Sequence, residues 1–324
     1  MTPSVPFTDR IADGWRRSGD ALWLAFVPVV LSLFSVDKIL GVLGLDGFHV
    51  GVTLVSFPSP SSGVWQFVNT PQSDAHVGLA ASLGVVAAAF VTSAFLLGGY
   101  LGSLRRLLDA GAAEYDFVGD ARAHLAPMAV WTGVPSLVTA GVVLVTGGFG
   151  TVDGSSAFLP VVLVLFVLYA VFGYLFYAAP FLVVLRETGI ADALRSSYDL
   201  ALSGGPYASY AVGYLLFALL VSVPMSLFVV NLGVVGLLLG IPVGGRVGLA
   251  ATTASMRFVA DVDDRSPTLR RWDDHRGVDT PGDAGGDSRG ERDEFGHDTP
   301  NDDAPDDDVP DDDVPDDGVG DPPR

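Results

Sequence analysis

Six apolar runs, each long enough to cross a membrane as a helix, constrain this chain more than any other feature. A helix needs roughly 20 apolar residues to cross about 30 Å of hydrocarbon. The sequence therefore predicts an all-α integral membrane protein with about six transmembrane helices. The predicted spans are residues 21–43, 77–102, 127–147, 158–185, 207–230 and 232–256.

The first run is the least regular, because Asp37 and Lys38 interrupt it. It also resembles the apolar core of a secretory signal peptide, since Arg10, Arg16 and Arg17 precede it. No small-x-small cleavage site follows the run, however. We therefore expect a retained first helix.

Arginines in alternate loops predict the orientation of the chain. They are Arg10, Arg16 and Arg17 before the first run, Arg105, Arg106 and Arg122 after the second, Arg186 and Arg195 after the fourth, and Arg257, Arg265, Arg270 and Arg271 after the sixth. Apart from histidines, the other loops contain only one basic residue, Lys38. Basic loops stay in the cytoplasm. The pattern therefore predicts a multi-pass protein of the cell membrane with both termini cytoplasmic.

Charge divides the chain into two physically different parts. Residues 261–324 contain 23 acidic and 7 basic residues, whereas residues 1–260 contain 14 and 11. The Asp- and Pro-rich segment 261–324 contains too little apolar surface to fold, and we expect a disordered cytoplasmic tail. The simplest interpretation of this tail is a solvated polyanion adapted to high salt; binding of calcium or of a basic partner is the alternative.

Outside the tail, residues 46–76 form the one long predicted external loop. Two β-prone stretches, 48–57 and 64–68, flank a segment rich in proline and serine. This arrangement favours an external β-hairpin, with a partly ordered loop as the alternative.

A ten-residue sequence before the first span recurs before the fifth. At an offset of 179 residues, the identical pairs are Ile11/Ile190, Ala12/Ala191, Asp13/Asp192, Arg16/Arg195, Ser18/Ser197 and Asp20/Asp199. A fainter copy, residues 118–121, precedes the third span. Aspartate and arginine three or four residues apart support a helix. We expect short amphipathic helices at the cytoplasmic interface, each opening one of three hairpins; a cytoplasmic binding surface is the alternative role.

The second copy also carries a family resemblance. The stretches APFLVVL, residues 179–185, and GIADALRSS, residues 189–197, resemble a pattern in uncharacterised haloarchaeal multi-spanning membrane proteins. More distantly, they resemble the membrane domain attached to some glycerophosphodiester phosphodiesterases, whose catalytic domain has no counterpart here. The resemblance implies a membrane architecture and no catalytic residues. Scarce lysine, absent cysteine and abundant aspartate likewise indicate a salt-loving archaeal source.

Arg246 is the most distinctive residue within a predicted span. It lies eleven residues before Arg257, which is about 16 Å along a helix. A charge at this depth is costly and is a candidate functional residue. Its partner would be Glu187, carbonyl groups freed by Pro242, or a lipid headgroup. The alternative is that Arg246 extends to the inner interface, where water solvates it.

Small residues on the last span predict close helix packing. Gly236, Gly240, Gly244 and Gly248 recur every four residues, and such a strip lets another helix approach closely. A substrate groove or a self-association face is the alternative interpretation. Gly98 and Gly102 form a shorter strip on the second span. Tyr169, Tyr174 and Tyr177 on the fourth span are either packing residues or the lining of a polar pathway.

Missing motifs limit the possible functions. No aspartate or glutamate lies in the middle of a predicted span, which argues against an intramembrane aspartyl protease and a carboxylate proton relay. The absence of cysteine excludes thiolate chemistry, and the five scattered histidines do not indicate a metal site. We expect no cofactor and no nucleic acid partner.

These features favour a non-enzymatic membrane scaffold or accessory component. Its expected partners are the lipid bilayer and a second copy of itself or another membrane protein. The alternative is a transporter or permease for a small or lipid-like solute, with Arg246 and the glycine strip on its pathway. A lipid-modifying enzyme ranks third.

Overall fold

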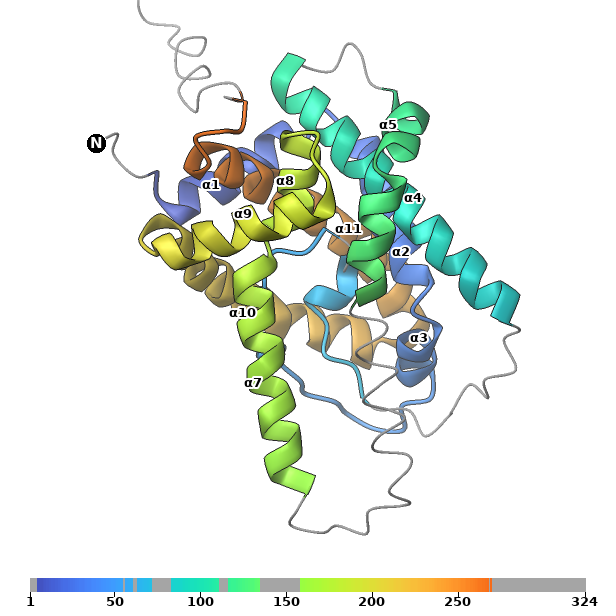
Figure 1. Ribbon diagram of the computed structural model, residues 1–324. Helices are drawn as coiled ribbons and strands as arrows, with labels where there is room; N and C mark the ends of the chain where they lie inside the picture. Colours follow the sequence, from blue (N-terminus) through green and yellow to red (C-terminus); the bar gives the residue numbers. More distant parts are fainter. Residues whose placement is uncertain are drawn as a thin grey trace, which may run out of the picture. The chain divides into compact units, whose positions relative to one another are not determined.

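The computed structural model describes residues 5–54, 56–60, 63–71, 83–110, 116–134, 158–267 and 269 (Figure 1). They belong to one compact unit, Met1–His275. Within these ranges every regular element is a helix and none is a strand. Of the predicted disordered tail, only residues 261–267 and 269 are described, so that prediction lies mainly outside the described residues.

The helices divide into short and long elements. The short helices are α1 (Phe7–Arg17), η1 (Leu22–Ala25), α2 (Phe26–Leu33), α3 (Val36–Leu43), η2 (Gly63–Gln66), α5 (Phe117–Ala123), α8 (Ala179–Leu185) and α9 (Ile190–Ser203). A further helix covers Leu125–Val134. The long helices are α4 (Leu83–Ala110), α7 (Phe158–Phe176), α10 (Pro206–Asn231) and α11 (Gly233–Val262).

Four described helical segments are long and apolar enough to cross a membrane. They are Ala87–Asp109, Leu163–Leu185, Pro206–Asn231 and Gly233–Val262. Leu22–Leu33 and Val36–Leu43 together add a fifth if they form one broken span. This composition is that of a multi-pass membrane protein. Of the predicted third span, 127–147, only the part up to Val134 lies within the described residues.

The first span is not the continuous helix that its apolar run predicts. Its two parts meet at an angle of 75°. The break lies at Phe34 and Ser35, and α3 begins immediately before Asp37, whose carboxylate lies in its first turn. An acidic residue at a helix N-terminus interacts favourably with the helix dipole. The charged pair that interrupts the apolar run thus coincides with the start of a second helix.

The fourth predicted span is divided into α7 and α8. The break follows Phe176, and Pro180 lies in the first turn of α8. Proline lacks an amide hydrogen and is well tolerated at this position, where no intrahelical bond is lost.

The predicted external β-hairpin is wrong for the described part of residues 46–76, which contains η2 and irregular chain. Side chains of α10 take the place of a neighbouring strand. The amide of His49 donates to Asn231 Oδ1 at 2.8 Å, and the amide of Thr53 donates to Ser222 Oγ at 2.8 Å. The amide of Asn69 donates to Ser226 Oγ at 2.9 Å. Backbone groups that are satisfied in this way need no β-ladder.

The short helices of the repeat pack in a consistent order (Figure 1). α5 packs on α4, the long helix that precedes it, and α9 packs on α7 and α8, which precede it. α1 is the first described helix, and it packs on α11, the last long helix of the described chain. The first and last described helices are therefore neighbours.

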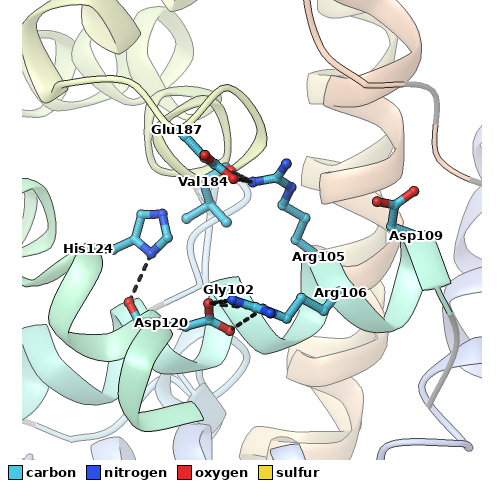
Figure 2. A pocket seen from close by; sticks show the side chains of 8 residues that line it. All are labelled: Gly102, Arg105, Arg106, Asp109, Asp120, His124, Val184 and Glu187. Carbon is cyan, nitrogen blue, oxygen red and sulfur yellow. Dashed lines mark hydrogen bonds and ion pairs between the residues drawn. The ribbon is translucent and has the colours of Figure 1, made fainter. Parts of the chain in front are cut away.

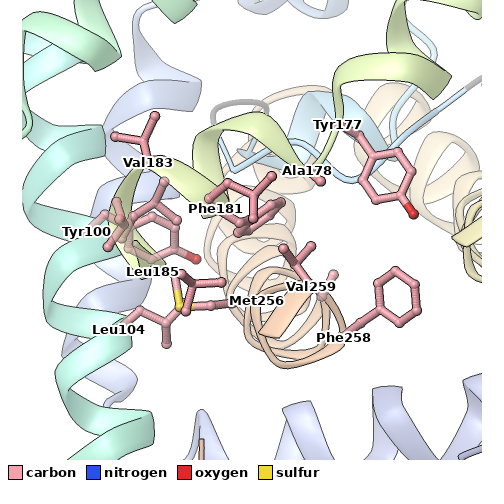
Figure 3. Packing of buried hydrophobic residues seen from close by; sticks show 14 of the residues in the cluster. Tyr100, Leu104, Tyr177, Ala178, Phe181, Val183, Leu185, Met256, Phe258 and Val259 are labelled. Atoms are coloured by element: carbon pink, nitrogen blue, oxygen red, sulfur yellow. The ribbon is translucent and has the colours of Figure 1, made fainter. Parts of the chain in front are cut away.

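The core lies where the C-terminal ends of α4, α8 and α11 meet. Leu104, Leu185 and Met256 come from these three helices, are at most 1% exposed and converge in Figure 3. Phe181 and Val259 pack in the same cluster and are fully buried.

Candidate functional site

Ionised side chains gather at the C-terminal ends of the long helices and on the short helices packed against them. They are Arg10, Asp13, Arg16, Arg17, Arg105, Arg106, Asp120, Arg186, Glu187, Arg257, Asp261 and Asp263, which we call the ion-pair network. The sequence places Arg105, Arg106 and Arg257 in loops. They lie instead inside α4 and α11, which continue past the predicted span ends at 102 and 256.

Asp13 is the most buried carboxylate of the network, at 1% exposure. Both of its oxygens accept hydrogen bonds from Nε of Arg17, at 2.9 and 3.1 Å. It also accepts a hydrogen bond from Nη1 of Arg257, which is itself only 2% exposed. The pair with Arg16, which the helical spacing predicts, is present but long, at 3.9 Å. Asp13 thus joins α1 to α11.

The surface of α1 that faces the protein is its polar surface. Arg10, Asp13, Gly14 and Arg17 are buried, whereas Trp15 is 48% exposed. Nη1 of Arg10 continues the contact by pairing with Asp261 at 2.7 Å. A Cβ atom at Gly14 would collide with the carbonyl oxygen of Ala250, so only glycine permits this approach.

A second part of the network lines a pocket of about 220 Å³ (Figure 2). Its lining residues are Gly102, Arg105, Arg106, Asp109, Asp120, His124, Val184 and Glu187. Arg106 of α4 donates hydrogen bonds from Nε and Nη2 to the carboxylate of Asp120 of α5, at 2.9 to 3.1 Å. A Cβ atom at Gly102 would collide with the Asp120 side chain, which explains the small residue there.

On the opposite side of this pocket, Arg105 binds the C-terminal end of α8. Its Nη1 donates to the Val184 carbonyl at 2.8 Å and to Glu187 Oε1 at 2.7 Å. Glu187 has a φ of 51°, and the amide of Thr188 donates to the Val183 carbonyl at 3.1 Å. This is the hydrogen-bonding pattern of a Schellman cap, and a cation there complements the helix dipole.

The chemistry of the pocket follows from these pairs. The hydrogen bond and positive charge of Arg105 lower the pKa of Glu187. A general acid needs a raised pKa to hold its proton near neutral pH, so Glu187 is poorly suited to that role. The arrangement is suited to joining helix ends and to contacting a charged partner.

Arg186 makes the corresponding connection from α8 to α11. Its Nε donates to Asp263 at 2.6 Å, and its Nη1 donates to Ser196 Oγ of α9 at 2.8 Å. Burial alone would raise the pKa of Asp263, but hydrogen bonds from Arg186 and Ser266 outweigh it and lower this pKa. The carboxylate is thus stabilised in its charged form.

Arg246 lies against the last turn of α1. Its Nη2 donates to the Trp15 carbonyl at 2.7 Å, its Nη1 donates to Ser18 Oγ, and its guanidinium lies 4.5 Å from the Trp15 ring centre. Glu187, the partner that the sequence suggests, binds Arg105. No sequence pattern links Arg246 to Trp15, because 231 residues separate them.

The glycine strip of α11 is covered by the chain itself. Gly236, Gly240, Gly244 and Gly248 are all buried. The first two face Val229, near the end of α10, the third faces Val64 of η2, and the fourth lies near Pro28 of α2. Gly98 of α4 similarly faces Ala121 of α5.

The three tyrosines of the fourth span do not line one path. Tyr169 is 61% exposed. Tyr174 donates to the Ala201 carbonyl and Tyr177 to the Tyr207 carbonyl, each at 3.1 Å. These two tyrosines therefore join α7 and its C-terminal end to α9 and α10.

Two buried hydroxyl groups were not singled out from the sequence. Tyr100 and Ser103 lie one turn apart on α4 and are at most 1% exposed, and within the described part of the chain their hydroxyl oxygens have no partner at hydrogen-bonding distance. Thr252 of α11 is near Tyr100. The residues around them in the sequence are mostly apolar, and this pattern does not indicate that a buried hydroxyl group lacks a hydrogen-bond partner.

Neither a search of the described residues for grouped metal ligands nor a comparison with known proteins identifies a further site. In the described part of the chain, no three His, Cys, Asp or Glu side chains are grouped so that they could hold a metal ion. The chain matches no family model, no curated protein and no solved structure.

Proposed function

We propose that this chain is a non-enzymatic scaffold of the cell membrane, which holds other membrane proteins at the face formed by its ion-pair network. The observation that carries the proposal is that the charged side chains form ion pairs between helices. Asp13, Asp120 and Asp263 each join an arginine of another helix, so that the charged groups fix helix positions.

Burial supports this structural role. Breaking a buried ion pair on one side costs roughly 3–5 kcal/mol, because the remaining charge is left unsolvated. A set of such pairs holds the helix ends in one arrangement. A rigid charged face is well suited to binding a partner of complementary charge with a defined geometry.

The proposed orientation places this face in the cytoplasm. The loops and helix ends that form this face are rich in arginine, and basic residues of membrane proteins concentrate on the cytoplasmic side. Both termini are cytoplasmic in this arrangement.

Photo-crosslinking in native membranes tests the proposal. A crosslinking side chain replaces Asp109, which lines the pocket and is exposed, and in a matched variant it replaces Leu220, which is 73% exposed on α10. The scaffold predicts a discrete protein adduct from position 109 and none from position 220. A mass of two chains identifies self-association, and another mass identifies a different protein. No protein adduct at position 109 would overturn the proposal.

Arg246 and the glycine strip suggested the alternative function, a transporter, but a different observation now supports it. The glycine strip faces other parts of the chain, and Arg246 binds α1. The hydroxyl groups of Tyr100 and Ser103, by contrast, are buried polar atoms for which the described residues supply no partner at hydrogen-bonding distance, although Thr252 lies near Tyr100. Buried polar atoms without partners are rare and call for an explanation.

Solute flux into proteoliposomes separates the two functions. Saturable uptake of a small solute that Tyr100→Phe with Ser103→Ala abolishes would establish the transporter. Flux equal to that of protein-free liposomes would remove it. Because flux and crosslinking are measured independently, one result does not determine the other.

A further inference from the structure

At the C-terminal end of α1, Arg16 follows an exposed tryptophan, and Arg246 of α11 packs on that tryptophan. Arg16 has a side chain that is 66% exposed, and Trp15 is 48% exposed. Arg246 reaches this end of α1 from α11 and lies over the Trp15 ring. A Cβ atom at Gly19 would lie 2.8 Å from the Arg16 carbonyl oxygen and 3.9 Å from Arg246 Nη2, so Arg246 lies close to the turn that carries Arg16.

The charge of these arginines is incompletely neutralised by the contacts around them. Arg246 is held by a carbonyl and a hydroxyl oxygen, and neither carries a full negative charge. Arg16 approaches Asp13 only to 3.9 Å, and this carboxylate already accepts hydrogen bonds from Arg17 and Arg257. Asp20 is exposed nearby in the chain and offsets one of the two charges. The surface therefore favours an anion.

Apolar surface continues from this point along the chain. Leu22 and Phe26, on η1 and α2, are 53% and 40% exposed. These elements pack beside Arg246, because a Cβ atom on its neighbour Gly245 would meet the Ala25 carbonyl and the Val29 side chain. A ligand that fits this surface therefore combines an anionic group with apolar chains.

We propose that Arg16 and Arg246 bind the phosphate headgroup of an anionic membrane phospholipid, whose acyl chains lie along Leu22 and Phe26. Guanidinium groups pair with phosphate oxygens through two parallel hydrogen bonds. Trp15 contributes a ring of the kind that concentrates at membrane interfaces. A soluble phosphate would gain nothing from the apolar surface, which selects the lipid as the ligand. The site shares Arg16 with the ion-pair network, but lipid binding does not depend on whether that network holds another protein.

Native mass spectrometry of the full chain measures this binding. The protein is titrated with phosphatidylglycerol and, separately, with zwitterionic phosphatidylcholine. Each arginine near a membrane surface contributes about 1 kcal/mol with anionic lipid, which is about a fivefold change in affinity. Arg246→Gln and Arg16→Gln should each lower the preference for phosphatidylglycerol about fivefold. Added inorganic phosphate should not displace the lipid.

The repeat supplies a matched control. Arg195 corresponds to Arg16 in the second copy and is also exposed, but Leu194 replaces tryptophan beside it. Arg195→Gln should keep the lipid preference. Arg246→Lys retains the charge and should keep part of the preference, even if Arg246→Gln unfolds. An equal loss in Arg16→Gln and Arg195→Gln, or displacement by inorganic phosphate, would overturn the proposal.

Discussion

The helices α1 and α9 contain the two copies of the repeated sequence but are held in different ways. Both are helical, and both bury the shared serine, since Ser18 at the end of α1 and its counterpart Ser197 are fully buried. They differ at the shared aspartate. Asp13 is buried between arginines, whereas Asp192 is exposed to the surroundings.

The difference comes from residues outside the shared pattern. Where α1 has Arg17, which binds Asp13, α9 has Ser196, which accepts a hydrogen bond from Arg186. On α11, Arg257 supplies the second cation for Asp13. The local sequence thus determines that a helix forms, and the neighbouring helices determine which contacts the shared aspartate makes in each copy.

The largest predicted contrast between the copies is at this aspartate. Asp13→Asn leaves Arg17 and Arg257 buried without their carboxylate and should lower the free energy of unfolding by roughly 3–5 kcal/mol. Asp192→Asn changes an exposed residue and should stay within about 0.5 kcal/mol. Thermal unfolding in detergent, followed by circular dichroism, measures both. Equal effects would mean that the ion pairs of α1 contribute little.

The next contrast is at the neighbouring position, where α1 has Gly14 and α9 has Ala193. Gly14→Ala forces a methyl group against the Ala250 carbonyl, and overpacking of this kind costs about 1–3 kcal/mol. Ala193→Gly loses only helix propensity and packing of one methyl group, about 1 kcal/mol. The same unfolding assay compares them, and a stabilised Gly14→Ala variant would show that α1 does not lie so close to α11.

A smaller effect concerns the pH dependence of the ion pair between Arg186 and Asp263, which lies beside α9. The pKa of Asp263 is lowered from its ordinary value of 3.8, so its pair with Arg186 stabilises the folded protein above that pH. This contribution is lost as the pH falls through the lower folded-state pKa, by about 1 kcal/mol or less. The free energy of unfolding, measured between about pH 2 and pH 5, should decline less steeply with falling pH for Asp263→Asn. An unchanged slope would contradict this assignment.

The smallest predicted contrast is at the shared arginine. Arg16→Gln and Arg195→Gln remove exposed charges, and each should change the free energy of unfolding by no more than about 0.5 kcal/mol. The two variants should therefore unfold alike while differing in lipid preference. A large loss of stability in Arg16→Gln alone would show that its long contact with Asp13 is structural.

The sequence was informative where a single segment determines its own structure. Uninterrupted apolar runs predict α10 and α11 closely, and the repeat predicts α1 and α9 as short helices. Each depends on the spacing of residues along one helix, which is readable without knowledge of the partner.

The sequence failed where partners come from far along the chain. Asp13 and Arg257 are separated by 244 residues, so the spacing that indicates Arg16 as a partner could not reveal the buried pair. Residues 48–57 and 64–68 are β-prone, but side chains of α10 instead accept hydrogen bonds from the amides of His49, Thr53 and Asn69. Arg106 and Arg257 marked the predicted ends of spans because arginine is costly in lipid. Their aspartate partners allow both helices to continue.

The packing of α1 on α11 also has a consequence for the order of assembly. A ribosome makes α1 first and α11 last among the described helices, so Asp13 and Arg17 emerge long before Arg257 exists. Until α11 has been made, Asp13 has no Arg257 to pair with. In a chain truncated before α11, the polar surface of α1 therefore stays uncovered. The contact between α1 and α11 forms only after the last described helix has been made.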